Sequence, residues 1–228
     1  MGEIKTNDLQ EVKNSAMEGF RNIMPETGGK IKDVRDYWVK EINSLSGFGG
    51  DYSSLEDRIK CTPSEVNENY EYSGLRGNSF LRPSEKTEKG RAMIELLKEY
   101  GVEGIMYKNG EPLFSKCAEA TVTIDNMTEN RKDYRNTDGD MQKGNFSQAD
   151  IKCAELWNKE KKDGRTDWTD EKVYDYRKAN SLEWHERCDT KTMDLLKHEI
   201  HAFFGHTGGV YECKNRDKAE IAGGIFDE

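Results

Sequence analysis

All four histidines of the chain lie in one C-terminal stretch, residues 182–209. They are His185, His198, His201 and His206. Histidine is the commonest protein ligand for metal ions and a frequent general base near neutral pH. Because all the imidazoles of the chain gather here, we expect its chemistry to lie in this stretch and to involve a divalent cation.

The local pattern predicts that three of these histidines meet in a strand–turn–strand–helix unit. The expected elements are a strand at 182–186, a polar turn at 187–190, a strand at 191–196 and a helix at 197–204 that ends at Gly205. His185 would lie on the first strand, opposite His201 on the helix, with His206 just beyond the helix. His198 is expected at the surface.

The spacing of His198 and His201 excludes one class of metalloenzyme. The two residues are three positions apart, whereas the His-Glu-x-x-His motif of zinc proteases places its histidines four positions apart on one helical face. A metalloprotease of that class is therefore not expected.

Four short motifs in this stretch occur in the order and spacing of a known superfamily. They are Trp184-His185-Glu186, Lys191-Thr192-Met193-Asp194-Leu195, Ile200-His201 and His206-Thr207-Gly208-Gly209. Together they resemble the HNH/endonuclease VII superfamily, and within it the bacterial toxin nucleases named for a Trp-His-His motif. The resemblance covers residues 77–213 and does not extend to the N-terminal segment.

This resemblance implies an α+β fold with a ββα-metal (His-Me finger) core at about 182–206, flanked by helices and a small β-hairpin. It implies a metal-dependent endonuclease acting on DNA, from a bacterial toxin, effector or prophage element. The matching positions give His185, His201 and His206 as metal ligands, and His185 with Glu186 as the catalytic residues. Mg²⁺ is the expected ion, with Zn²⁺, Ni²⁺ or Mn²⁺ as alternatives.

Glu186 is the main departure from the family pattern, in which a second histidine often serves as the general base. Either Glu186 is the base, or His185 is the base and Glu186 supports the metal site. A glutamate with an ordinary pKa of about 4.3 is a weaker base at neutral pH than a histidine with a pKa of about 6.5, which favours His185. Arg187 and Lys191 are candidates for binding substrate phosphates.

Two other functions remain open. RNA could replace DNA as the substrate, because contacts to phosphates carry little information about the sugar. Alternatively, Glu186 marks a degenerate, non-catalytic module that only holds a structural metal ion. The resemblance to toxins also implies a cognate immunity protein as a partner.

The bulk composition limits the surface and the cellular compartment. With a net charge of -9, 34% hydrophobic residues and a mean hydropathy of -0.98, any basic surface for nucleic acid must be local. The five cysteines include no Cys-x-x-Cys pair, which argues against a disulfide framework and a zinc ribbon. The sequence has no signal peptide and no membrane segment. We therefore expect a cytoplasmic protein, or one delivered into the cytoplasm of a target cell.

The remaining sequence predicts two regions, a helical and partly disordered N-terminal segment at 1–75 and a nuclease domain at 76–228. A stretch rich in glycine, serine and asparagine at 46–84 predicts a linker. Helical periodicity predicts helices at about 7–24, 30–45, 83–100, 148–161 and 170–180. Asn109-Gly110 predicts a β-hairpin, and a further strand is expected at 120–124.

Overall fold

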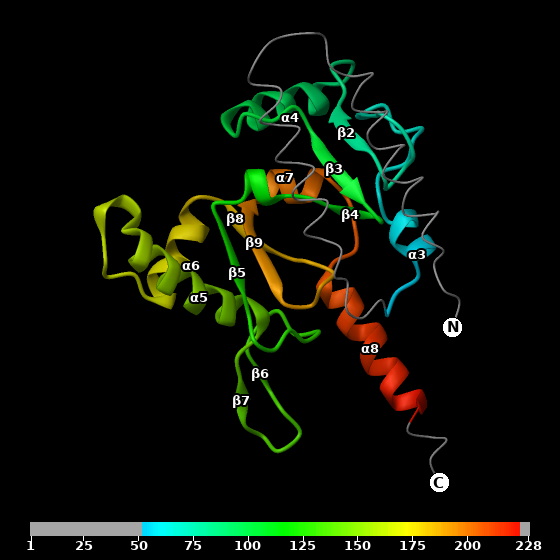
Figure 1. Cartoon of the computed structure of the whole chain (residues 1–228). Coiled ribbons are helices and arrows are strands. Elements are labelled where there is room, and N and C mark those ends of the chain that lie inside the picture. The colour runs from blue at the N-terminus through cyan, green and yellow to red at the C-terminus, as the bar shows by residue number, and fades with distance from the viewer. Residues whose placement is uncertain (1–51, 224–228) are drawn as a thin grey trace.

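The computed structural model describes residues 52–223, so the helices predicted at 7–24 and 30–45 lie outside the described residues. The described part has an α+β fold, as predicted, built from helices and small antiparallel sheets (Figure 1). The helices are α3 (Leu55–Lys60), α4 (Glu88–Glu99), α5 (Asn145–Glu160), α6 (Asp170–Ala179), α7 (His198–Phe203) and α8 (Gly209–Gly223). The strands are β1 (Tyr70–Tyr72), β2 (Phe80–Pro83), β3 (Ile105–Lys108), β4 (Glu111–Pro112), β5 (Ala120–Thr123), β6 (Tyr134–Arg135), β7 (Met141–Gln142), β8 (Leu182–Glu186) and β9 (Thr192–Lys197).

The element that positions the site is a three-stranded antiparallel sheet with the strand order β5-β9-β8. Its middle strand, β9, is buried on both faces, because Met193 and Leu195 enter one hydrophobic core and Leu196 enters another. Successive side chains of a strand point to opposite faces, so such a strand needs apolar residues on both. Trp184 of β8 lies opposite Leu195 in the register and joins the same core.

Two separate cores thus cover the two faces of this sheet. Helices α5 and α6 cover one face, while α7, α4 and the strands β2 and β3 lie on the other (Figure 1). Trp157, Trp168 and Trp184 are buried in the first core, and Leu81, Leu97 and Phe114 in the second. The sheet is therefore held in place from both sides.

The predicted hairpin at Asn109-Gly110 is confirmed. Both residues have positive φ angles, 52° for Asn109 and 80° for Gly110, which is the backbone that a tight two-residue hairpin requires. Strands β3 and β4 pair on either side of this turn. The hairpin brings Glu111 and Phe114 towards the histidine stretch.

The linker predicted at 46–84 is wrong for the residues that the structure describes. This segment forms α3, β1 and β2, and its glycine, serine and asparagine residues make the turns between these short elements. Leu81 is fully buried, and the Tyr70 hydroxyl donates a hydrogen bond to the Phe203 carbonyl at 2.6 Å. Strands β1 and β2 pair across residue 75, which the sequence suggested as a domain boundary.

The helices α4, α5 and α6 occur where periodicity predicted them, with one shift. Helix α5 begins at Asn145 after Gly144, not after the predicted N-cap Ser147. Glycine suits this position because a Cβ there would lie 2.3 Å from the Lys132 carbonyl carbon. The hairpin of β6 and β7, which projects from the body of the molecule in Figure 1, was not predicted, because strands of two polar residues have no readable periodicity.

All five cysteines are free thiols, as their spacing predicted. Four of them are buried and only Cys61 is exposed. Among residues 52–223, no helix combines the length and the apolar character that crossing a bilayer requires.

Candidate metal centre

The strand–turn–strand–helix unit predicted around the histidines is present. Strands β8 and β9 form an antiparallel pair, and α7 follows β9 without a break. His185 lies on β8, His201 lies on α7, and His206 follows the end of that helix. Helix α7 packs on both strands, so these three side chains come from one connected unit.

His185, His201 and His206 converge as expected. Each residue offers one ring nitrogen, and these three atoms lie within 4.8 Å of one another. The closest pair, Nδ1 of His185 and Nε2 of His206, is 3.0 Å apart. Metal–nitrogen bonds of about 2.0–2.1 Å in tetrahedral geometry place the ligand atoms about 3.3 Å apart, so a small adjustment would accommodate a cation.

Phe114 forms the floor beneath the three imidazoles. Its ring is fully buried and meets the rings of His185, His201 and His206 edge-on, with centroid distances of 5.1, 6.2 and 5.6 Å. Burial lowers the pKa of His185 well below its ordinary value and lowers that of His206 to about 3. Both rings are therefore neutral at physiological pH, which is the form that binds a metal ion.

Hydrogen bonds orient the rings of His206 and His185. Nδ1 of His206 lies 2.7 Å from the Phe204 carbonyl oxygen, which can only accept, so Nδ1 carries the proton and Nε2 keeps its lone pair. Nε2 of His185 is buried and has no hydrogen-bond partner. Nδ1 is therefore the nitrogen of His185 that faces the position between the rings. A cation held there would satisfy ring nitrogens that otherwise face only one another.

Glu183 is a site residue that the sequence analysis missed. It precedes His185 by two positions, and strand alternation places both side chains on the face towards α7. Its carboxylate lies 2.5 Å from Nδ1 of His198 and 3.8 Å from Nδ1 of His201, and this pairing, led by His201, lowers the pKa of Glu183 to about 2. A carboxylate on Nδ1 leaves Nε2 of His201 for a metal ion. His198 itself is exposed and stands outside the three-histidine cluster, as expected.

Glu186 points to the opposite face of β8 from His185. Its buried carboxylate accepts two hydrogen bonds from Nε of Arg131, at 3.0 and 3.2 Å. The side chain of Glu186 is 2% exposed and that of Arg131 is 50% exposed. The carboxylate that stands in the place of the family's second histidine is thus engaged in an ion pair.

Residues 104–208 match a protein-family model. The family is described as the DNase/tRNase domain of colicin-like bacteriocins. The matched range runs from the start of β3 to Gly208 and contains all three clustered histidines. No curated protein and no solved structure matches the chain. The match supports a bacteriocin-type nuclease domain over these residues.

The two cations proposed for substrate phosphates occupy different settings in this nuclease domain. Arg187 forms a two-pronged ion pair with the buried carboxylate of Asp194, at 2.7 and 2.9 Å. Asp194 also accepts a hydrogen bond from Thr121 at 2.7 Å. Lys191 is exposed in the turn between β8 and β9. Arg187 thus fastens the strands of the central sheet, and Lys191 is accessible to a ligand.

The paired glycines after His206 allow the chain to close over the end of β8. A Cβ on Gly208 would lie 2.4 Å from the Glu186 carbonyl oxygen, and one on Gly209 would lie 2.3 Å from the Met127 sulfur. Neither gap can hold a side chain. The His-Thr-Gly-Gly motif therefore fixes His206 by letting the backbone of the following residues approach β8 closely.

Glu111, at the end of the β3–β4 hairpin, is a buried carboxyl beside this nuclease site. It accepts a hydrogen bond from the Cys188 backbone N–H at 2.6 Å, and burial raises the pKa of Glu111 to about 7. The fold therefore favours its protonated form. Its contribution to stability is full below the unfolded pKa of about 4.5 and is lost as the pH rises through 7.

The Glu111→Gln variant, which stays neutral at every pH, is accordingly expected to be more stable than the wild type at pH 8. The gain should be on the order of 2 kcal/mol, because each unit of pKa shift corresponds to about 1.4 kcal/mol. At pH 4 the two proteins should be nearly equal. Urea unfolding at both pH values measures this, with the exposed Glu71→Gln as the control. An equal difference between variant and wild type at the two pH values would contradict it.

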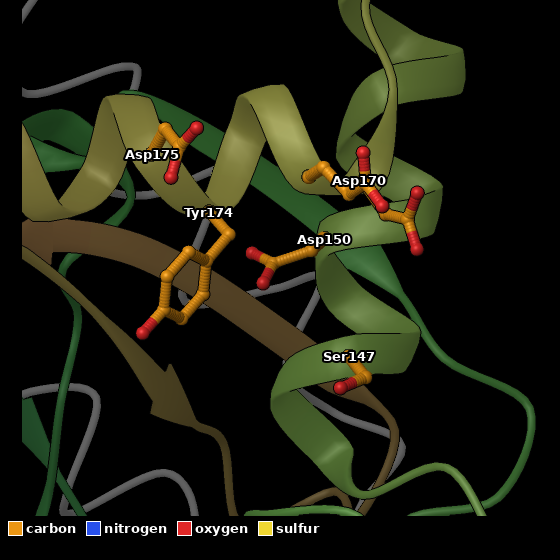
Figure 2. Close-up of a pocket in the computed structure, with 6 residues that line it drawn as sticks. Ser147, Asp150, Asp170, Tyr174 and Asp175 are labelled. Atoms are coloured by element: carbon orange, nitrogen blue, oxygen red, sulfur yellow. The ribbon is translucent and has the colours of Figure 1, made fainter.

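A cleft between α5 and α6 lies on the other face of the central sheet. Figure 2 shows Ser147 and Asp150 on α5 facing Asp170, Tyr174 and Asp175 on α6. Most of this lining is acidic and would repel a phosphate backbone. The cleft is therefore not suited to a nucleic-acid substrate, unlike the side of the sheet that carries the histidines.

Proposed function

We propose that this chain is a metal-dependent endonuclease of the bacteriocin type that hydrolyses phosphodiester bonds in DNA. The observation that carries the proposal is the convergence of His185, His201 and His206 within the range matched to a nuclease domain. The neutral state of His185 and His206 and the carboxylate on His201 support their use as ligands. By the same reasoning the enzyme acts inside a target cell, and its producer needs an immunity protein.

The donor set bears on the identity of the ion. Three imidazole nitrogens suit Zn²⁺, Ni²⁺ or Mn²⁺, whereas Mg²⁺ prefers oxygen ligands. The donors therefore favour a transition metal over the Mg²⁺ expected from the family resemblance. A divalent cation at this place would neutralise the charge that develops on the scissile phosphate and its leaving oxygen.

His185 acts through Nδ1, the nitrogen that faces His206. Two roles are open to this atom: third ligand of the cation, or acceptor of the proton from the attacking water. In either role a neutral imidazole is needed, and burial provides it. Glu186, the other candidate base, is paired with Arg131. These contacts support His185 as the residue on which activity depends.

Metal removal tests the function without any substitution. The full chain, stripped with a chelator, is incubated with plasmid DNA and with tRNA, alone and after addition of Zn²⁺, Ni²⁺, Mn²⁺ or Mg²⁺. We expect no cleavage by the stripped protein and recovery of plasmid cleavage with a transition metal. Cleavage of tRNA alone would move the substrate to RNA, which the family description also covers. Metal binding without cleavage of either substrate would favour the non-catalytic module.

A further inference from the structure

The ion pair between Arg131 and Glu186 serves no evident purpose in the ligand cluster, yet it lies at its edge. We propose that Arg131 binds a non-bridging oxygen of the scissile phosphodiester, and that Glu186 is a positioning residue that holds Arg131 for this contact. This inference rests on the proposed nuclease function and deepens it. It assigns Glu186 a role other than general base.

The exposures of the two side chains differ in the way this role requires. Glu186 is 2% exposed, and a carboxylate so deeply buried needs a charged partner. Arg131 is 50% exposed, and both of its hydrogen bonds to Glu186 use Nε. The terminal amino groups of a guanidinium held through Nε remain suited to bind a phosphate with two parallel hydrogen bonds.

The backbone that carries Arg131 is fastened to the start of α5. The side chain of the buried Asn145 bonds both ways with the backbone of Thr128, at 3.0 and 2.8 Å. The backbone N–H of Asn145 donates to the Asn130 carbonyl at 2.9 Å, and that of Phe146 donates to the Arg131 carbonyl at 3.1 Å. A surface arginine without a ligand needs no such support, whereas a group that must meet a reacting phosphate does.

Arg131 is also within electrostatic reach of the histidine cluster. Its positive charge contributes to the lowered pKa values of both His185 and His206. A Cβ placed on Gly208 would lie 2.4 Å from the Glu186 carbonyl oxygen and 3.8 Å from Cε1 of His185, so Glu186 and the cluster meet at one corner of the molecule. A phosphate at the cation position therefore has Arg131 beside it.

The chain offers a matched control in Arg165. This arginine is 44% exposed and, like Arg131, pairs through Nε with a carboxylate, that of Asp167, at 2.9 Å. The difference is that Asp167 is 60% exposed, whereas Glu186 is buried. Arg165 also lies outside the histidine site, before α6. Substituting either arginine changes the net charge of the chain equally.

Steady-state cleavage by the metal-loaded full chain tests the catalytic part. Arg131→Ala is expected to lower kcat by about 10²-fold, the usual effect of losing one donor to a transition-state oxyanion, with little change in KM. Arg131→Lys should recover part of the rate, and Arg165→Ala should stay within twofold of the wild type. Thermal melting of each variant identifies any loss caused by unfolding, and for Arg131→Ala the double variant below removes the unpaired carboxylate.

A double-substitution cycle separates a positioning role from a base. If Glu186 acts through Arg131, Glu186→Gln lowers kcat about tenfold, and Arg131→Ala with Glu186→Gln is no slower than Arg131→Ala alone. If Glu186 is the base, Glu186→Gln is the slowest single variant and the two losses multiply. Multiplied losses would overturn the positioning role, and a fully active Arg131→Ala would overturn the phosphate contact.

Binding without metal gives a readout that is independent of turnover. With chelator present, the salt dependence of binding to a labelled DNA duplex should lose about one unit of slope in Arg131→Ala, and none in Arg165→Ala. An unchanged slope in Arg131→Ala would overturn the inference. If His185→Ala cleaves as well as the wild type, the proposed function itself fails. If only Arg131→Ala is fully active, the nuclease function stands and this inference alone is lost.

Discussion

Replacing His185 with alanine is expected to lower plasmid cleavage by about 10²–10⁴-fold, the range associated with loss of a general acid or base. The loss follows from the position of His185 in the cluster, where Nδ1 lies 3.0 Å from Nε2 of His206. The matched control is His198→Ala, which removes an exposed histidine of the same stretch that lies outside the cluster. His198→Ala should cleave at nearly the wild-type rate. Equal cleavage by His185→Ala and the wild type would remove the cluster from the mechanism.

The same variants distinguish the two roles of His185. Zn²⁺ binding by calorimetry should weaken by more than 100-fold in His206→Ala, since losing even a residue that only orients a ligand costs about 10–100-fold in affinity. If His185 is the third ligand, His185→Ala weakens binding as much as His206→Ala does. If His185 is the base, His185→Ala keeps wild-type affinity while losing cleavage. Glu183→Gln should fall between, because it leaves the nitrogen of His201 in place but removes its support.

Removing Asp150 is expected to cause the largest loss of stability. Its carboxylate receives Nε and a terminal amino group of Arg177 at 2.9–3.1 Å and the indole N–H of Trp184 at 2.8 Å. Both partners of the ion pair are nearly inaccessible, with side chains 5% and 6% exposed. Asp150→Ala leaves the Arg177 charge buried without compensation, which typically costs about 3–5 kcal/mol. Because Trp184 precedes His185, the loss should also disturb the site.

Urea unfolding measures this effect against a matched exposed pair. Asp167→Ala breaks the ion pair between Asp167 and Arg165 at the surface and should leave stability nearly unchanged. The double variant Asp150→Leu with Arg177→Met, which removes both charges, should recover most of the stability lost in Asp150→Ala. A midpoint for Asp150→Ala equal to that of Asp167→Ala would show that the buried network contributes little.

The histidine stretch was readable from the sequence because each of its elements follows a local rule. Alternation predicted β8 and β9, Gly205 marked the end of α7, and the spacing of His185, His201 and His206 followed from these elements. The Asn109-Gly110 turn was readable for the same reason. Local pattern therefore sufficed for the unit that carries the candidate ligands.

The surroundings of the site depend on contacts between distant segments, and no local rule contains them. Phe114, Glu111 and Arg131 reach the histidines from elsewhere in the chain. Glu183 was within reach, since it shares a strand face with His185, but its pairing with His201 requires the position of α7. The segment at 52–84 was misjudged because its turn residues outnumber the few anchors, such as Leu81, that pack its strands.

The most direct test of the central claim is anomalous diffraction from crystals of the zinc-loaded protein. The account predicts a single strong peak enclosed by the imidazoles of His185, His201 and His206, with zinc–nitrogen distances of about 2.0–2.1 Å. A peak held by other residues, or no peak between these rings in protein shown to contain zinc, would contradict it.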